Sequence, residues 1–284
     1  IIVFSRKESL EIGCGIYILA SSITSLVTMI LFALKFWFLF YSHQNLVNFQ
    51  QISFGNCFVI EPLLKIFLYA NGWLNACVAM DRTATAILGT SRDRRLSKIV
   101  AKLVTIMLFI IITCLFIPQL MHLQIFYDEA EERTWCVVTY KHWLIIYSTF
   151  WIFFHYFAPV LINIISIIYV LRIAIQKQAR FNSQYTWWKN VRTQLRKHRH
   201  LLISSTTVVL LMLPHLFISI ILDCRKSSNL LWFYLIGYFL SFLPAASVFL
   251  IFVLSSSFYR KLFRTLIDHF LRQIEIWKMN SLRL

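Results

Sequence analysis

The stretch CFVIEPLLKIFLYANGWLNACVAMDRT, residues 57–83, decides the fold class of this chain. Between Lys65 and Asp81 it carries no charged residue, and the 25 residues from Cys57 to Arg82 rise about 37 Å as an α-helix. About 20 mostly apolar residues are enough to cross the hydrocarbon core of a bilayer. The stretch therefore predicts a transmembrane helix, with Cys57 at one face of the membrane and Arg82 at the other.

The composition of the whole chain agrees with a membrane protein. Of its 284 residues 59 % are apolar, 17 % aromatic and 14 % charged, and the mean hydropathy is +0.68. Soluble domains carry about 25 % charged residues, and a chain so rich in aromatic residues does not stay disordered. A net charge of +16 in a soluble protein would suggest nucleic acid, but membrane proteins hold Lys and Arg in cytoplasmic loops. We expect no nucleic-acid partner.

Six apolar stretches are long enough to span a membrane. They cover residues 12–40, 57–88, 99–122, 142–173, 201–222 and 230–254. None of them alternates polar and apolar residues in the way that membrane β-strands do. The sequence therefore predicts an all-α integral membrane protein, a transmembrane helix bundle with six spans.

The loops give the orientation. Lys and Arg concentrate before the first span, after the second, after the fourth and after the sixth. The other connections are sparsely basic, and residues 128–132 are mostly acidic. The positive-inside rule then places the basic loops and the C-terminal tail in the cytoplasm. Residues 1–4 are apolar and precede Arg6 and Lys7, so they resemble the last turn of an earlier span. With that span there would be seven, and the N-terminus would lie outside.

Six cysteines fall into two groups. Cys14, Cys77 and Cys114 lie within predicted spans, where we expect packed thiols. The others, Cys57, Cys136 and Cys224, lie at or near the outer face, which is oxidising. The residues alone leave open whether these three are free or bridged.

The end of the second span, Val78-Ala-Met-Asp-Arg82-Thr83, resembles the Asp/Glu-Arg-Tyr motif that closes the third helix of rhodopsin-like (class A) G-protein-coupled receptors. In that family the outer end of this helix carries a Cys that bridges to the second outer loop, at the spacing that separates Cys57 from Arg82. The resemblance covers nearly the whole chain as topology. It implies a Cys57–Cys136 disulfide and a seven-helix receptor of the plasma membrane that performs no chemistry.

The resemblance also implies partners and a switch. A receptor of this family binds an extracellular ligand and signals to a cytoplasmic heterotrimeric G protein. Asp81 and Arg82 would pair in the resting state, and Arg82 would meet the G protein after activation. Thr83 replaces the Tyr of the family motif. An outward swing of the fifth span about Pro214 would accompany activation.

Three inner motifs depart from the family pattern. Residues 211–214 read LMLP and lack the Trp that usually precedes Pro214. Residues 248–252 read VFLIF, so that only an aromatic residue, Phe252, remains of the usual Asn-Pro-x-x-Tyr. Residues 19–23 read LASSI and lack the Asp that helps to bind sodium. The sequence predicts a divergent receptor, with Pro214 and Phe252 among its switch residues.

Charged residues in the outer halves of two spans predict a ligand pocket. Glu61 and Lys65 share one helical face, and charges at such depth are costly unless they are paired or hydrated. Either they line a water-filled pocket, or Glu61 pairs with Lys65 alone while Lys35 snorkels outward. In the family that the chain resembles, this stretch of the third helix faces the ligand, which implies Leu64 and Leu68 as further pocket residues. The pocket candidates are Lys35, Glu61, Leu64, Lys65, Leu68 and His215. The acidic residues 128–132 favour a cationic peptide as the ligand.

Two further expectations concern the tail and the polar residues within spans. Residues 258–271 predict an amphipathic helix at the lipid surface, so that residues 1–256 form the receptor bundle and residues 257–284 the cytoplasmic helix and tail. Within the spans we expect Trp73 to pack in the core and the other polar groups to hydrogen-bond across helices. These groups are Asn71, His155, Tyr156 and Asn163.

The main alternative function is a six-span channel or transporter. The chain shows no internal repeat of the kind that transporters use and no charged ring or filter. An intramembrane enzyme is a third class, but neither His-Glu-x-x-His nor Gly-x-Ser-x-Gly occurs. The eight His residues show no metal-ligand spacing. We expect no enzymatic activity, no cofactor and no bound metal.

Overall fold

A computed structural model describes residues 4–5, 13–43, 54–88, 93–128, 133–138, 142–181, 210, 239–240, 242–243, 246–247 and 257–281. The predicted spans 201–222 and 230–254 lie almost entirely outside these residues, as do Pro214, His215 and Phe252. The count of six spans therefore stays a prediction.

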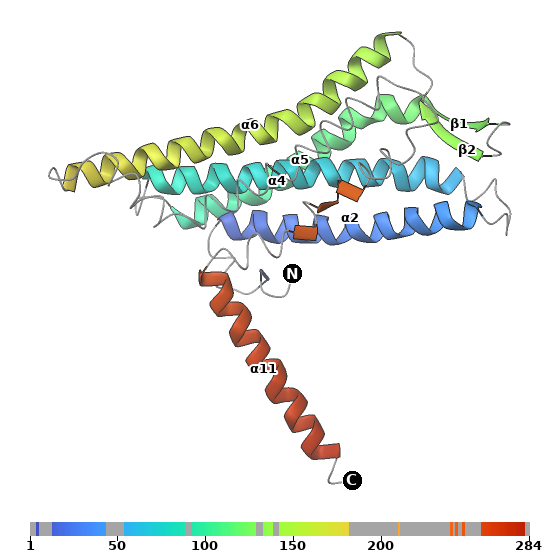
Figure 1. Cartoon of the computed structure of the whole chain (residues 1–284). Coiled ribbons are helices and arrows are strands. Elements are labelled where there is room, and N and C mark those ends of the chain that lie inside the picture. The colour runs from blue at the N-terminus through green and yellow to red at the C-terminus, as the bar shows by residue number, and fades with distance from the viewer. Residues whose placement is uncertain are drawn as a thin grey trace.

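Four long helices form a bundle. They are α2 (Gly13–His43), α4 (Glu61–Leu88), α5 (Arg94–Met121) and α6 (His142–Phe181), and they coincide with the first four predicted spans. Each contains a segment long and apolar enough to cross a membrane. Figure 1 shows the helices running along one another, and α4 is central because α2, α5 and α6 all pack on it. The prediction of a helical membrane bundle is confirmed.

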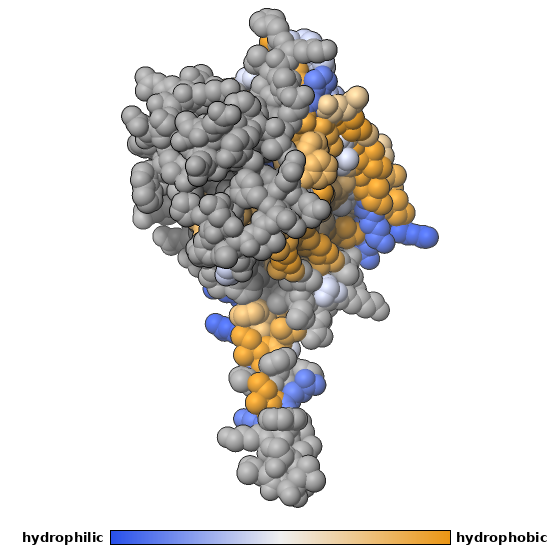
Figure 2. Space-filling view, turned by 90° about the vertical axis from the view of Figure 1, so that its right-hand side faces the viewer, coloured by the Kyte–Doolittle hydropathy of each residue, from blue (hydrophilic) through white to orange (hydrophobic). Residues whose placement is uncertain are grey.

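Burial distinguishes the central helix from its neighbour α5. In the most apolar part of α4, 56 % of the residues are buried, against 17 % in α5. Large apolar side chains of α5, including Leu103, Ile106 and Ile110, are exposed. Figure 2 shows the apolar surface that covers one side of the bundle. Lipid tails are the solvent that accommodates such a surface.

Two helices extend beyond their apolar spans. Helix α5 begins at Arg94 rather than at residue 99, because the Asp93 carboxylate accepts a hydrogen bond from the Arg95 backbone N at 2.8 Å and so caps the helix. Helix α6 continues past residue 173 to Phe181. Hydropathy locates the hydrocarbon layer and not the end of the hydrogen-bonded helix, so it assigned these residues to the basic loops.

A β-hairpin fills the connection between α5 and α6, which the sequence predicts only as an acidic loop. Strand β1 (Leu123–Asp128) pairs antiparallel with β2 (Arg133–Val138). Asp128 and Arg133 form the last pair of the ladder, on either side of the connecting residues 129–132. The chain is therefore not wholly α-helical. The hairpin lies where α2 ends and α4 begins (Figure 1). We call this end of the bundle the hairpin end, and the opposite one the Arg82 end.

The last helix, α11 (Ser257–Ser281), covers the predicted segment 258–271 and continues beyond it. Three of its apolar residues, Leu262, Phe263 and Leu266, pack against a buried cluster of the bundle that includes Ile18 and Leu74. The remainder of α11 extends away from the bundle (Figure 1). Its expected position at the lipid surface stays a prediction.

Candidate functional site

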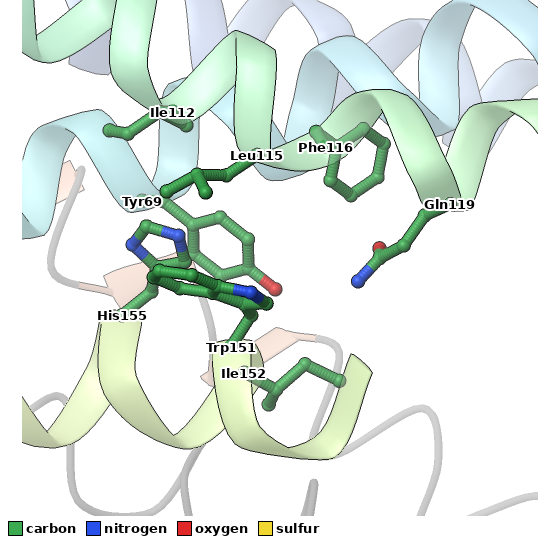
Figure 3. A pocket seen from close by; sticks show the side chains of 8 residues that line it. All are labelled: Tyr69, Ile112, Leu115, Phe116, Gln119, Trp151, Ile152 and His155. Atoms are coloured by element: carbon green, nitrogen blue, oxygen red, sulfur yellow. The ribbon is translucent and has the colours of Figure 1, made fainter. Parts of the chain in front are cut away.

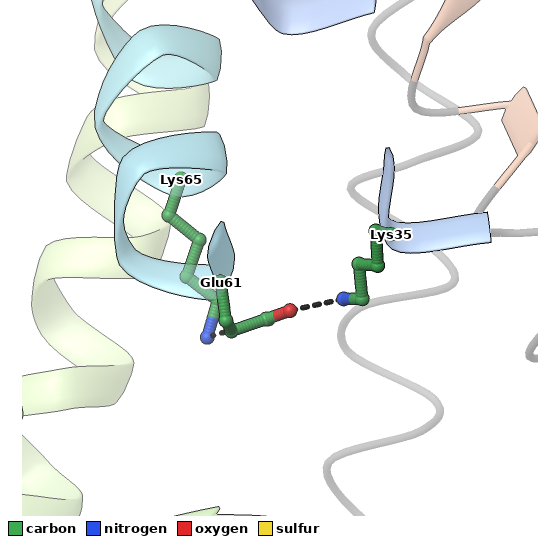
Figure 4. A network of polar contacts seen from close by, with 3 residues as sticks. All are labelled: Lys35, Glu61 and Lys65. Carbon is green, nitrogen blue, oxygen red and sulfur yellow. Dashed lines mark hydrogen bonds and ion pairs between the residues drawn. The ribbon is translucent and has the colours of Figure 1, made fainter. Parts of the chain in front are cut away.

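Three charged side chains meet at the hairpin end. Glu61 begins α4, and its carboxylate is hydrogen-bonded and ion-paired to the Lys35 ammonium of α2. Its other oxygen, Oε1, lies 3.4 Å from Nζ of Lys65, one turn further along α4. Figure 4 shows the Glu61 carboxylate between the two lysines. The side chain of Lys35 is 8 % exposed and that of Lys65 39 %, so Lys65 is the charge that a ligand reaches most readily.

The alternative in which Lys35 snorkels outward is wrong. Its side chain turns into the α2–α4 interface and is buried there with Glu61. The physical reason is the high cost of an ionised group at membrane depth, which a close opposite charge offsets. The pairing therefore ties two helices together and places charge at the hairpin end.

The two leucines predicted for the pocket, Leu64 and Leu68, lie on α4 in the first turns after Glu61. Leu64 is buried, and Leu68 is half-buried and packs against an aromatic cluster that contains Tyr69 and Tyr156. The structure thus brings Lys35, Glu61 and Lys65 together, whereas Leu68 belongs to a different contact. The sixth candidate, His215, lies outside the described residues.

Polar side chains continue the α2–α4 interface into the middle of the bundle. The Ser21 hydroxyl donates to Asn71 Oδ1 at 2.7 Å and lies 3.5 Å from Asn75 Oδ1. Both asparagines are buried. A hydrogen bond of Asn71 across helices was predicted and is confirmed, whereas Ser21 and Asn75 were not singled out. Segment 19–23 lacks the Asp that helps to bind sodium in the resembled family. Here the hydroxyl of Ser21, in the same segment, makes the contacts to the two asparagines.

Aromatic side chains fill the other side of α4, toward α6. The Trp73 indole N–H donates to Nδ1 of His155 at 3.0 Å, and the ring of Tyr69 stacks on His155 with centroids 4.7 Å apart. Trp73 therefore makes an interhelical hydrogen bond, which the prediction of core packing did not include. His155 hydrogen-bonds across helices as predicted. Figure 3 shows the rings of Tyr69, His155 and Trp151 with Gln119 around a small cavity. The cavity has room for about one water molecule.

Two expectations about polar and thiol groups need correction. Asn163 does not bond across helices, because its amide donates to the Pro159 carbonyl one turn back in α6, at 2.8 Å. Cys114 is not packed, because it lies on the exposed face of α5. Cys14 is half-buried and Cys77 buried within the bundle, as expected.

Cys57 lies in η1 (Asn56–Ile60), a π-helical turn that leads directly into α4. It is 2 % exposed and disulfide-bonded. Strand β1 contacts this turn, and Cys136 stands on β2 opposite Ile125 of β1. This placement favours Cys136 as the partner, and the Cys57–Cys136 pairing stays our prediction.

At the Arg82 end, Asp81 is buried at a junction of three helices. The start of α2 and the start of α5 meet the end of α4 there, and Gly13 lies close to both Asp81 and Ser97. Arg82, the next residue, is half-buried. Sequence reasoning singled out Asp81 and Arg82 but missed Gly13 and Ser97, since the rotation of each helix about its axis is not encoded in hydropathy. The roles of Pro214 and Phe252 fall outside the described residues.

One family of known proteins matches the chain over most of its length. The model of the family described as "7 transmembrane receptor (rhodopsin family)" matches residues 1–270. No curated protein matches the chain. The match covers the charged trio and the Asp81–Arg82 pair alike.

Proposed function

The chain belongs to the rhodopsin family of seven-transmembrane receptors, and on that premise we propose that it binds an extracellular ligand at the hairpin end and signals to a heterotrimeric G protein at the Arg82 end. It is a multi-pass membrane protein, and its family is generally non-enzymatic. Our proposal adds the plasma membrane as its location, with the C-terminal tail in the cytoplasm.

The observation that carries the proposal is the placement of two charged groups on one buried helix. Glu61 and Asp81 are 20 residues apart on α4, which corresponds to about 30 Å of helix and thus to the thickness of the hydrocarbon core. The first belongs to the charged trio at the hairpin end, and the second to the motif that resembles the family's coupling site. A single rigid element therefore links the two ends.

We place ligand contacts at the charged trio, with Leu64, Leu68 and His215 as further candidates. Lys65 is part-exposed, so it is the group that a charged or strongly polar ligand would meet first. A peptide is favoured, because residues 128–132 are mostly acidic and attract a cationic chain. Ligand binding would favour one of two helix arrangements by stabilising it more than the other.

We place G-protein contacts at Arg82, with Asp81 as its resting partner and Pro214 and Phe252 as switch residues. Arg82 lies near the end of α4 away from the hairpin and follows Asp81, which lies close to Gly13 at the start of α2. Helix α11 carries three exposed basic residues at the Arg82 end of the bundle. They are Arg260, Lys261 and Arg264. They are suited to anionic lipid or to an acidic partner surface.

The experiment that tests the proposal needs no known ligand. Cells express the receptor with sensors for each class of heterotrimeric G protein, and basal activation is divided by the amount of receptor at the surface. We expect one class to respond to the wild-type chain and to lose its response with Arg82→Ala. The control is Arg94→Ala, which removes an exposed Arg from the start of the neighbouring helix α5. An equal loss with both variants, or no response to the wild type, contradicts the proposal.

A further inference from the structure

The junction around Asp81 is so tight that one of its positions has no room for a side chain. A Cβ atom built on Gly13 would lie 2.4 Å from Ser97 Oγ, 2.9 Å from the Ser97 backbone oxygen and 3.3 Å from Asp81 Oδ1. Two of these distances are shorter than carbon and oxygen atoms tolerate without displacement. The backbone oxygen belongs to the first turns of α5, so relieving its contact requires α2 and α5 to move apart.

The same junction encloses the Asp81 side chain. Asp81 is 7 % exposed and Ser97 8 %, and Gly13 is buried between them. A carboxylate at the membrane boundary reaches such burial only when neighbouring elements close around it. Here the closing elements are α2 and α5, and they approach each other closely at a residue without a side chain.

We propose that Gly13 is a positioning residue for the coupling site. Because Gly13 has no Cβ, α2 and α5 close over Asp81 and hold it in the resting arrangement. A side chain at position 13 separates the two helices, uncovers Asp81 and raises the fraction of receptors in which Arg82 meets the G protein. This role rests on the function that we propose for Asp81 and Arg82.

The first test measures how accessible the Asp81 carboxylate is in the purified full-length chain. Carboxyl groups are labelled with a water-soluble carbodiimide and glycine ethyl ester, and the label on Asp81 is quantified by mass spectrometry. Gly13→Ala should raise this labelling several-fold. Adding Ser97→Gly removes the closest contact and should return the labelling most of the way, with a remainder because the backbone oxygen at 2.9 Å stays.

The chain offers a matched control. Gly55 is also a glycine beside α4, but a Cβ atom there meets nothing within 4 Å. Gly55→Ala should therefore leave the labelling of Asp81 unchanged. Should Gly13→Ala fail to fold, Ser97→Thr adds a methyl group from the opposite wall of the junction and should shift the labelling in the same direction.

The second test measures basal G-protein activation per surface receptor. Gly13→Ala should raise it several-fold, Gly55→Ala should not, and Arg82→Ala should abolish the increase. The inference is overturned if the labelling of Asp81 does not rise with Gly13→Ala or rises equally with Gly55→Ala. It is also overturned if adding Ser97→Gly does not lower the labelling again. Increased labelling with unchanged activation, while activation still requires Arg82, overturns the positioning role alone. No activation by the wild type overturns the proposed function, and the positioning role with it.

Discussion

The two sides of helix α4 hold the bundle together by different means. The side toward α2 is joined by polar groups: the Lys35–Glu61 pair near the hairpin end and the Ser21–Asn71 hydrogen bond midway. The side toward α6 is joined by rings, with Tyr69 stacked on His155 and Tyr156 packed edge-on against Tyr69. On the ring side Trp73 adds one hydrogen bond, to His155.

The difference shows what specifies helix contacts in lipid. Apolar packing alone gains little from burial there, because lipid tails are as apolar as the side chains that they replace. Polar pairs are directional and costly to break, so the α2–α4 contact has a defined register along the helices. Ring contacts tolerate adjustment, which suits the side of α4 where α5 and α6 meet the surrounding lipid. We therefore expect the polar side to be the more sensitive to substitution.

Breaking the Lys35–Glu61 pair should have the largest effect on stability. Glu61→Leu leaves the Lys35 ammonium buried without that carboxylate, and removing one member of a buried ion pair typically costs about 3–5 kcal/mol. The measurement is thermal unfolding of the detergent-solubilised receptor. The double variant Lys35→Met/Glu61→Leu should recover much of the lost stability, because it removes the buried ammonium together with its carboxylate. Equal stability of Glu61→Leu and the wild type would show that the pair does not hold the interface.

Substitutions at Lys65 separate its charge from its shape. Lys65→Ala should weaken an activating ligand by about 10–100-fold, because a hydrogen bond to a charged group is worth about 1.5–3 kcal/mol. Lys65→Arg keeps the charge and should weaken the ligand less. The concentration of ligand that gives half-maximal signalling is the readout, corrected for surface receptor. Equal effects of the two substitutions would remove Lys65 from the proposed ligand site.

The Ser21–Asn71 hydrogen bond should show a smaller but measurable coupling. A double-mutant cycle with Ser21→Ala and Asn71→Leu isolates it, and interhelical hydrogen bonds in membranes average about 0.6 kcal/mol, with a maximum of about 1.7. Thermal unfolding of the four proteins gives the coupling. We expect it in the upper part of this range, because Asn71 is 1 % exposed. Additive single effects would indicate that the hydrogen bond does not contribute.

The smallest effect is expected on the ring side. Trp73→Phe removes the indole N–H that His155 accepts, but His155 keeps its stacking on Tyr69, so the loss should be about 0.5–1 kcal/mol. Tyr169→Phe, at an exposed aromatic position of α6, serves as the control and should have no effect. A loss with Trp73→Phe larger than that with Asn71→Leu would reverse the proposed difference between the two sides.

Much of the fold could be predicted from the sequence, because the length of an apolar run directly reflects the thickness of a membrane. The four described spans and the charged ends of α4 follow from that rule. The hairpin could not be predicted in this way, since the connection between α5 and α6 was judged by its acidic residues. Its two six-residue strands, Leu123–Asp128 and Arg133–Val138, lie outside the long apolar runs, where this rule carries no information.

Contacts between helices were predicted only in part. The i,i+4 spacing of Glu61 and Lys65 was readable from α4 alone, whereas the partnership of Glu61 with Lys35 depends on how α2 is rotated about its own axis. Ser21, Ser97 and Gly13 were missed for the same reason. Small residues give little signal in a sequence, yet they mark the positions where two helices approach most closely.

The central claim is that α4 couples the hairpin end to the Arg82 end. The most direct test attaches an environment-sensitive fluorophore to Val59→Cys, an exposed position next to the charged trio. The chain also carries Cys114→Ser, which removes the exposed thiol found among the described residues. Adding the nucleotide-free G protein that the receptor activates should change the fluorescence, and GTPγS should reverse the change. Arg82→Ala should abolish it. An unchanged signal, or an equal change in Arg82→Ala, would contradict coupling through α4.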